Sequence, residues 1–302
     1  MQGATIGLDI GGTKITGIIM SPGGEVLAEA RAASEPADYT SHLMAVGDVI
    51  DGLTSAAPDL PHDAPIGVSQ AGLIRDSGDD IIAYNLPCLK GQRLRSDMAE
   101  KFSRPVTIIN DATAFTLSEM QDGAATKAQR PLGIILGTGL GGGFVLRLPD
   151  GGFETSLQAS WGEMAAPAST AKAPMTLADA IAGPVLERQW KDSGGDAGFN
   201  ATDIAQAATS GNDLAVRLME RFWWQMALGL ANAINMLGPD LIVFGGSLSA
   251  MPGLLEEMKL RIPRHTVAFQ PGPTLVRAKH GPDSGVRGAA WMVRQSGQDQ
   301  SA

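Results

Sequence analysis

The chain opens with a strand, a tight glycine turn and a second strand, and this unit constrains the fold more than any other feature. The turn reads Asp9-Ile-Gly11-Gly12-Thr13-Lys14, with apolar runs at 4–10 and 14–20. A glycine turn can present bare backbone N–H groups that form a concave anion site. A carboxylate beside it can hold hydrated Mg²⁺, which prefers oxygen ligands. The sequence therefore predicts a site for the phosphates of ATP, although an ordinary tight hairpin has the same pattern.

A second strand–turn–strand unit lies in the other half of the chain. The run Gly137-Thr138-Gly139-Leu-Gly-Gly-Gly143 separates apolar strands expected at 132–136 and 143–148. So many glycines are costly in chain entropy, so something bulky is expected against this backbone, with a flexible hairpin loop as the alternative. Two such units predict two related lobes that hold a nucleotide's phosphates from opposite sides. Neither loop has the Lys-Ser/Thr of a Walker loop, and neither leads into a helix as in dinucleotide-binding motifs.

Composition limits the possible classes of protein. With 302 residues, 44% of them hydrophobic, the chain is long enough for two domains with a sizeable core. The net charge of -9 argues against a nucleic-acid or anionic-membrane partner. No signal peptide is expected, and the most apolar helix candidate, 222–237, is too short to span a bilayer. The single cysteine, Cys88, suits a reducing compartment, so a cytoplasmic location is expected.

Apolar periodicity predicts an α/β fold in which strands come first and then alternate with helices. Strands are expected at 4–10, 14–20, 25–32, 65–70, 106–109, 132–136, 143–148, 239–244 and 274–278. Helices are expected at 39–56, 92–102, 176–192, 200–208, 212–237, 250–262 and 284–295, followed by a frayed polar tail from Gln295. The predicted domains are a first lobe over 1–122, rejoined by the C-terminal helix at 284–302, and a second lobe over 123–283.

Three polar positions stand out as candidates for chemistry. Asn110-Asp111 directly follows an apolar strand and opens a helix, which is where α/β proteins place ligands and catalysts. In phosphoryl transfer such an Asp can accept the proton of the substrate hydroxyl. The simpler interpretation is a helix N-cap. Glu163 could bind the hydroxyls of a polyol or lie free on the surface, and Asn85 is a possible further polar contact in a turn.

Together these motifs resemble the ROK family of sugar kinases and repressors, which has the actin/hexokinase-like (ribonuclease H-like) fold of two lobes with a duplicated mixed sheet. The motifs that carry the resemblance are Asp9-Ile-Gly-Gly-Thr-Lys14, Asn110-Asp111, the glycine run at 137–143 and Asp240-Leu-Ile-Val-Phe-Gly245-Gly246. The segments at 85–87, 94–98 and 279–291 look most like the bacterial fructokinase and N-acetylglucosamine kinase branch. Because the motifs occur in order over nearly the whole chain, they are more specific than any single loop.

The resemblance implies an ATP-dependent sugar kinase that phosphorylates the 6-hydroxyl of a hexose or N-acetylhexosamine, with fructose, N-acetylglucosamine and glucose all open. Asp111 would be the catalytic base. The implied substrate-binding residues are Asn110, Asp111, Glu163, Asn85 and Gly72. The implied ATP-binding residues are Asp9, Gly11, Gly12, Thr13, Lys14, Gly137, Thr138, Gly139, Gly245 and Gly246, with Asp9 holding Mg²⁺ through water. The family habit also implies a homodimer, to which the 222–237 helix could contribute.

One segment departs from the family pattern. The family usually has Gly-Glu-x-Gly-His followed by a zinc-binding cysteine cluster, whereas this chain has Gly162-Glu163-Met-Ala-Ala166 and no such cluster. A further sugar-binding Glu is replaced by Ala178, with Asp179 beside it as a possible substitute. We therefore predict no zinc site. Two lost hydrogen bonds, at roughly 0.5–1.5 kcal/mol each, would weaken sugar binding by about one to two orders of magnitude.

Two alternatives belong to other functional classes. A degenerate ROK protein could act as a non-catalytic sugar or nucleotide sensor, which the missing histidine and cysteines would favour. Direct DNA repression is not expected, because family repressors carry a helix-turn-helix ahead of the first phosphate strand and only residues 1–5 precede it here. Acetate-type phosphotransfer or a chaperone-like ATPase would use the same fold, but the short length and the Asn-Asp/Gly-Glu pairing argue against both.

Overall fold

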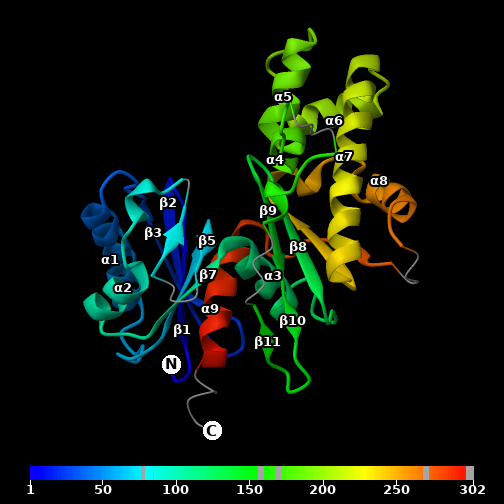
Figure 1. Ribbon diagram of the computed structural model, residues 1–302. Coiled ribbons are helices and arrows are strands. Elements are labelled where there is room, and N and C mark those ends of the chain that lie inside the picture. The colour runs from blue at the N-terminus through cyan, green and yellow to red at the C-terminus, as the bar shows by residue number, and fades with distance from the viewer. Residues whose placement is uncertain (76–78, 84, 156–159, 168–171, 268–271, 297–302) are drawn as a thin grey trace.

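The computed structural model describes residues 1–75, 79–83, 85–155, 160–167, 172–267 and 272–296. It consists of two α/β lobes, and each lobe is built on its own mixed sheet (Figure 1). The predicted fold class, a two-lobed actin/hexokinase-like arrangement of mixed sheets, is confirmed. In the described part of the chain, no helix has both the length and the apolar character needed to cross a membrane.

The first sheet has five strands in the order β3-β2-β1-β4-β7. Their bounds are β1 Thr5–Ile10, β2 Lys14–Met20, β3 Val26–Ala33, β4 Ile66–Gln70 and β7 Val106–Asn110. The hairpin β1–β2 is antiparallel, and β1, β4 and β7 run parallel to one another. The carboxyl ends of these three parallel strands therefore meet at one edge, where ligands bind in α/β sheets.

The second sheet repeats this plan with four strands in the order β13-β12-β8-β9. Their bounds are β8 Pro131–Leu136, β9 Leu140–Phe144, β12 Leu241–Gly245 and β13 Thr274–Arg277. The hairpin β8–β9 is antiparallel, and β8, β12 and β13 are parallel. In each lobe, therefore, an antiparallel hairpin comes first, and the first strand of that hairpin also pairs with a parallel strand. The two sheets therefore show the duplicated fold that the two strand–turn–strand units predicted, which residue identity between the lobes supports only weakly.

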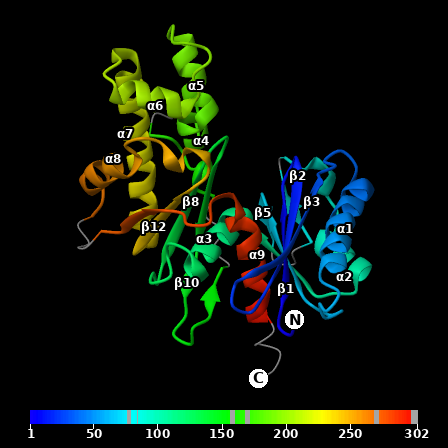
Figure 2. The same cartoon turned by 180° about the vertical axis from the view of Figure 1, so that it is seen from behind.

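Helices cover both faces of each sheet. The helices α1 (Tyr39–Ala56) and α2 (Leu94–Phe102) cover the outer face of the first sheet, and α9 (Ser284–Ser296) covers its inner face (Figures 1 and 2). The inner face of the second sheet is covered by α3 (Asp111–Asp122). On its outer side lie α4 Leu177–Ile181, α5 Gly183–Asp192, α6 Ala201–Thr209, α7 Asp213–Leu237 and α8 Leu254–Arg261. The helices α3 and α9 therefore lie side by side between the lobes.

The inner faces carry glycine where a central helix approaches closely. A Cβ at Gly7 of β1 would lie 2.3 Å from the backbone oxygen of Val286 on α9. In the second sheet, a Cβ at Gly143 would lie 2.0 Å from the backbone oxygen of Ala112 on α3. Side chains at these positions would push the helices away from the sheets. The outer faces instead carry large apolar residues, such as Leu132 and Phe244, that pack against the outer helices.

Most predicted elements are present within a few residues of their expected bounds, but two predictions were wrong. The strand expected at 143–148 begins earlier, at Leu140, and stops at Phe144, because Gly141 and Gly143 pack beneath α3 as part of the strand. The helix expected at 176–192 is split at Ala182, which is extended and precedes a helix with proline in its first turn.

Two short hairpins escaped the periodicity analysis because they are brief. They are β5–β6 (Leu73–Ile74 and Ile81–Ile82) and β10–β11 (Leu146–Arg147 and Phe153–Glu154). The residues of the predicted polar tail beyond 296 lie outside the described part of the chain. The predicted domain boundary between residues 122 and 123 stays a prediction.

Candidate active site

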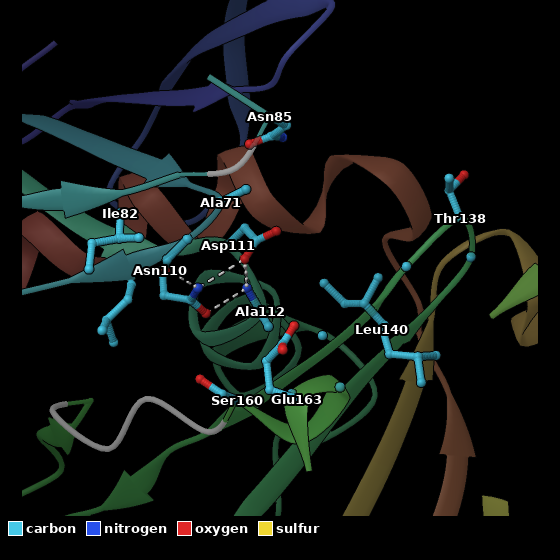
Figure 3. Close-up of a pocket in the computed structure, with 18 residues that line it drawn as sticks. Ala71, Ile82, Asn85, Asn110, Asp111, Ala112, Thr138, Leu140, Ser160 and Glu163 are labelled. Carbon is cyan, nitrogen blue, oxygen red and sulfur yellow. Dashed lines mark hydrogen bonds between the residues drawn. The ribbon is translucent and has the colours of Figure 1, made fainter. Parts of the chain in front are cut away.

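A cavity of about 560 Å³ is lined by residues from both lobes (Figure 3). Its walls come from the β5–β6 hairpin, the start of α3, the β8–β9 hairpin and the short 3-10 turn Trp161–Glu163. All of the predicted substrate-binding residues line it: Gly72, Asn85, Asn110, Asp111 and Glu163. Of the predicted ATP-binding residues, Gly137, Thr138 and Gly139 line it. The other predicted ATP-binding residues, Asp9, Gly11, Gly12, Thr13, Lys14, Gly245 and Gly246, are not among its lining residues.

The register of the first sheet explains why Asn110 and Asp111 reach this cavity. Ile10 pairs with Gln70 and Gln70 pairs with Asn110, so the ends of β1, β4 and β7 lie in line. The chain then enters α3 at Asp111. The polar residues that end these strands are consequently brought to one edge of the sheet, next to the second lobe.

Asn110 is an N-cap, as the simpler interpretation proposed, and its amide also joins two parts of the site. Its Oδ1 accepts hydrogen bonds from the backbone nitrogens of Ala112 (3.0 Å) and Thr113 (3.2 Å). Its Nδ2 donates to the backbone oxygen of Gly72 (2.9 Å) and to Oδ1 of Asp111 (3.0 Å). One side chain therefore connects the β5–β6 segment, the start of α3 and the neighbouring carboxylate.

Asp111 combines the position and the chemistry of a general base. Its Oδ1 accepts the hydrogen bonds of Asn110 Nδ2 and of the Ala112 backbone nitrogen, at 3.0 and 2.8 Å, which fix the orientation of the carboxylate. Burial raises the pKa of Asp111 above its ordinary value, and hydrogen bonding opposes part of that shift. A carboxylate with a raised pKa is a better proton acceptor than an ordinary one.

Asp9 lies at the end of β1 and is electrostatically coupled to Asp111. Ser69 Oγ donates to Asp9 Oδ1 at 2.7 Å. Burial raises the pKa of Asp9, and the negative charge of Asp111 raises it further, whereas Ser69 and Lys14 act in the opposite direction. A buried acid whose ionisation is disfavoured by a second nearby carboxylate fits a site that receives a cation. Asp9 can therefore hold a hydrated Mg²⁺, which needs only one or two carboxylates when phosphates supply other ligands.

The two glycine turns have fewer available amides than the sequence suggested. In the first turn, the nitrogen of Gly11 donates to the backbone oxygen of Lys14 at 3.0 Å. In the second, the nitrogen of Gly137 donates to the oxygen of Gly139 at 3.1 Å. These two N–H groups serve the turns themselves, so they are not available to a phosphate. A Cβ at Gly139 would meet no atom within 4 Å, so this backbone is open to a ligand.

The remaining glycines have packing roles that the sequence did not reveal. A Cβ at Gly12 would lie 3.0 Å from the backbone oxygen of Asn85, which brings the first turn against a residue that lines the cavity. Gly246 has φ +81°, and a Cβ there would lie 2.1 Å from the oxygen of Leu136. A Cβ at Gly245 would lie 2.4 Å from the ring of Phe115. The 245–246 turn therefore lies against the end of β8 and against α3.

Several cavity residues were not found by sequence reasoning. They are Ala71, Leu73, Ile82, Ala112, Ser160 and Gly162, together with residues of β8 and β9. The only signal for the apolar wall was the pair of short apolar runs on either side of an acidic turn. Asp79 in that turn accepts hydrogen bonds from the nitrogen and hydroxyl of Ser96, at 2.8 and 2.7 Å, which join the turn to α2.

Backbone hydrogen bonds join the two ends of the segment that departs from the family pattern. Ala166 donates to the oxygen of Met175, and Leu177 donates to the oxygen of Met164, both at 2.8 Å. Asp179, proposed as a substitute sugar ligand, is instead the partner of Thr176 in a capping box and does not line the cavity. Among the described residues no three His, Cys, Asp or Glu side chains gather as a metal site would require. The absence of zinc stays a prediction.

The fold and this cavity define a class of protein. An actin/hexokinase-like phosphotransferase has these features: two lobes with paired hairpins, a cavity between them and an ionisable carboxylate at a strand end. The sequence matches the ROK family over residues 5–296, and the chain belongs to that family.

Known relatives agree with this membership. The chain is 32% identical to an N-acetyl-D-glucosamine kinase of Photobacterium profundum, over 95% of this chain and 98% of the relative. Among solved structures, a ROK hexokinase from Thermus thermophilus superimposes with a TM-score of 0.83 at 24% identity, covering 98% and 99% of the two chains. A ROK family glucokinase from Streptomyces griseus, solved in complex with glucose and AMPPNP, superimposes with a TM-score of 0.75 at 25% identity, covering 97% and 100%.

Proposed function

We propose that the protein transfers the γ-phosphoryl group of ATP to the 6-hydroxyl of N-acetylglucosamine or a closely related hexose. The protein is an enzyme of the sugar kinase class, a phosphotransferase with an alcohol acceptor. The observation that carries the proposal is the place of Asp111. It lies in the same cavity as the open turn at Gly139 and the carboxylate of Glu163.

Asp111 acts as the general base. As the 6-hydroxyl oxygen attacks the γ-phosphorus, its proton passes to the carboxylate of Asp111, the bond to the β-phosphate oxygen breaks, and ADP leaves. Hydrogen bonds from Asn110 and Ala112 to Oδ1 hold the carboxylate in one orientation. Glu163 binds the sugar hydroxyls, Asn110 lines the sugar site and orients Asp111, and Gly72 and Asn85 complete the site.

The two turns stabilise the charge of the phosphates. The backbone amides of Gly12 and Thr13 in one lobe, and of Thr138 and Gly139 in the other, are the proposed donors. Fixed donors of this kind need no reorganisation during the reaction. Asp9 would hold hydrated Mg²⁺, which neutralises phosphate charge when bound. The 245–246 turn would lie against the adenosine half of ATP.

The non-catalytic sensor is not favoured. The departures in the 162–179 segment affect sugar contacts, whereas Asp111 and both turns, which serve the transfer step, are present. The relatives that match nearly the whole chain are named as kinases. The acetate-type and chaperone-like alternatives have no support from these relationships.

The deciding variant is Asp111→Asn. It keeps an Oδ1 acceptor for Asn110 and Ala112 but cannot take up the substrate proton, so we expect turnover to fall by about 10²–10⁴-fold with ATP binding retained. A coupled ADP-release assay over N-acetylglucosamine, glucose, fructose and N-acetylmannosamine measures turnover, and calorimetry with AMPPNP measures binding. Asp48→Asn, on an exposed position of α1, is the matched control. Wild-type turnover in the Asp111 variant would remove this residue from its role.

Three further properties are part of the proposal. Mg²⁺ is the metal that accompanies ATP, and the protein is a cytoplasmic enzyme, as its single cysteine suggests. It also forms a homodimer. The exposed Trp224 on α7, which is 42% accessible, supports the suggestion that this helix contributes to the contact.

A further inference from the structure

A fully buried carboxylate lies where the chain crosses between the lobes. The chain crosses once through α3, which leads from β7 to β8, and again through residues 278–283, which lead from β13 to α9. Glu119 on α3 is 0% exposed. It does not line the cavity, and no step of the proposed reaction uses it.

Both oxygens of Glu119 accept hydrogen bonds from the two crossings. Oε2 accepts from the backbone nitrogens of Ala124 (2.8 Å) and Lys279 (3.0 Å). Oε1 accepts from the backbone nitrogen of His280 (3.0 Å) and lies 3.1 Å from the Ser284 hydroxyl, whose proton is shared with the oxygen of Gly281. An ionised carboxylate has about four acceptor sites, and these donors occupy them. The first crossing and the second are therefore joined through one side chain.

Two glycines make room for this arrangement. A Cβ at Gly123 would lie 2.2 Å from Glu119 Oε2, so the carboxylate occupies the space that any other residue would fill. A Cβ at Gly288 on α9 would lie 1.8 Å from the backbone oxygen of Ala114 on α3. The two central helices thus pack at backbone contact, and they lie side by side in both views (Figures 1 and 2).

The same two helices begin beside the two carboxylates of the proposed reaction. Asp111 is the first residue of α3, about two helical turns before Glu119. At the start of α9, Ser284 bonds Glu119, and a Cβ at the next residue, Gly285, would lie 3.0 Å from Asp9 Oδ1. A change in the position of α3 relative to α9 therefore changes the separation of Asp111 and Asp9.

We propose that Glu119 is the pivot of lobe closure. Its carboxylate joins the two crossings, so that the lobes move about a fixed axis and bring Asp9 and Asp111 to a defined separation. Glu119 touches no substrate and acts as a positioning residue. The proposal rests on the proposed function only in that sugar and nucleotide are taken as the ligands that close the lobes.

The test uses the full chain with one spin label on each lobe. Cysteines replace the exposed Met44 on α1 and Leu260 on α8, with Cys88→Ser removing the native thiol. Glu119→Gln has the same size, but in either orientation its NH₂ group faces two of the donors. We expect a narrow distance distribution in the parent and a broad one in Glu119→Gln without ligand. N-acetylglucosamine with AMPPNP should shorten and narrow the parent distribution only.

Kinetics supply a second readout. We expect Glu119→Gln to lower kcat/KM for N-acetylglucosamine by about tenfold or more, because small misplacements of catalytic groups are costly. Glu256→Gln on α8 makes the same change at an exposed carboxylate and should match the parent in both measurements. Ligand-free distributions of equal width in the parent and in Glu119→Gln would overturn the proposal.

Should Glu119→Gln fail to fold, Ser284→Ala decides in its place. It removes one donor and leaves the backbone bonds, so a smaller broadening supports the pivot and a parent-like distribution overturns it. The ligand-free measurement also separates this proposal from the proposed function. Broadening by Glu119→Gln in a protein that phosphorylates none of the tested sugars would retain the pivot and reject the proposed sugar phosphorylation.

Discussion

At the scale of single residues, burial makes Asp111 a stronger base and sets the acid side of the pH profile. The carboxylate must be ionised to accept a proton, so turnover should fall as pH falls through its pKa. Because burial raises that pKa above the ordinary value of 3.8, the loss should occur at higher pH than an unperturbed aspartate would produce. Measuring kcat/KM for the sugar against pH checks this. An acid limb with its midpoint at or below the ordinary pKa of aspartate would contradict this prediction.

The same raised pKa has a consequence for stability with a defined sign. The folded chain binds this proton more tightly than the unfolded chain, so the contribution of Asp111 to stability falls as pH rises from the ordinary value through the raised one. The Asp111→Asn variant has no carboxylate to ionise here, so it does not lose this stability as pH rises. At neutral pH the inactive variant should therefore unfold in urea at the same concentration as the wild type or at a higher one.

At the scale of elements, the glycines of the second turn and its following strand have two different purposes. Gly143→Ala places a Cβ 2.0 Å from the Ala112 oxygen, so it should lower the free energy of unfolding by about 1–3 kcal/mol and displace the start of α3. Gly139→Ala meets no atom within 4 Å, so it should leave stability within about 0.5 kcal/mol and weaken ATP binding. Urea unfolding and AMPPNP calorimetry separate the two effects, and equal stability losses would refute the distinction.

How far the sequence could predict these elements depended on how local the determining contacts are. The apolar runs of β1, β8 and β12 and the amphipathic helix α1 carry their own periodicity, and Asn110 caps α3 through its immediate neighbours. The start of β9 was wrong because α3, earlier in the chain, determines where its glycines lie. The role of Glu119 was invisible for the same reason, since its partners include residues 160 or more positions away.

At the scale of the whole molecule, the proposed homodimer is open to direct measurement. Light scattering during size exclusion should give a mass of twice the 31.4 kDa of one chain. Trp224→Lys places a charge at an exposed apolar position of α7 and should shift the mass toward that of the monomer. Trp223, buried beside Phe222 in the core, is not a suitable substitute. A single-chain mass for the wild type at every concentration would reject the dimer.

The helix α9 covers the inner face of the first sheet. The hydroxyl of Thr5 donates to the oxygen of Ala290, 285 residues later, and α9 packs on the face of β1. During synthesis, which proceeds from the N-terminus, the first lobe therefore keeps an uncovered apolar face until the ribosome has made α9. Contacts so distant in sequence also slow folding. The nascent chain is consequently exposed to aggregation, and to chaperone capture, from the time β7 is made until α9 emerges.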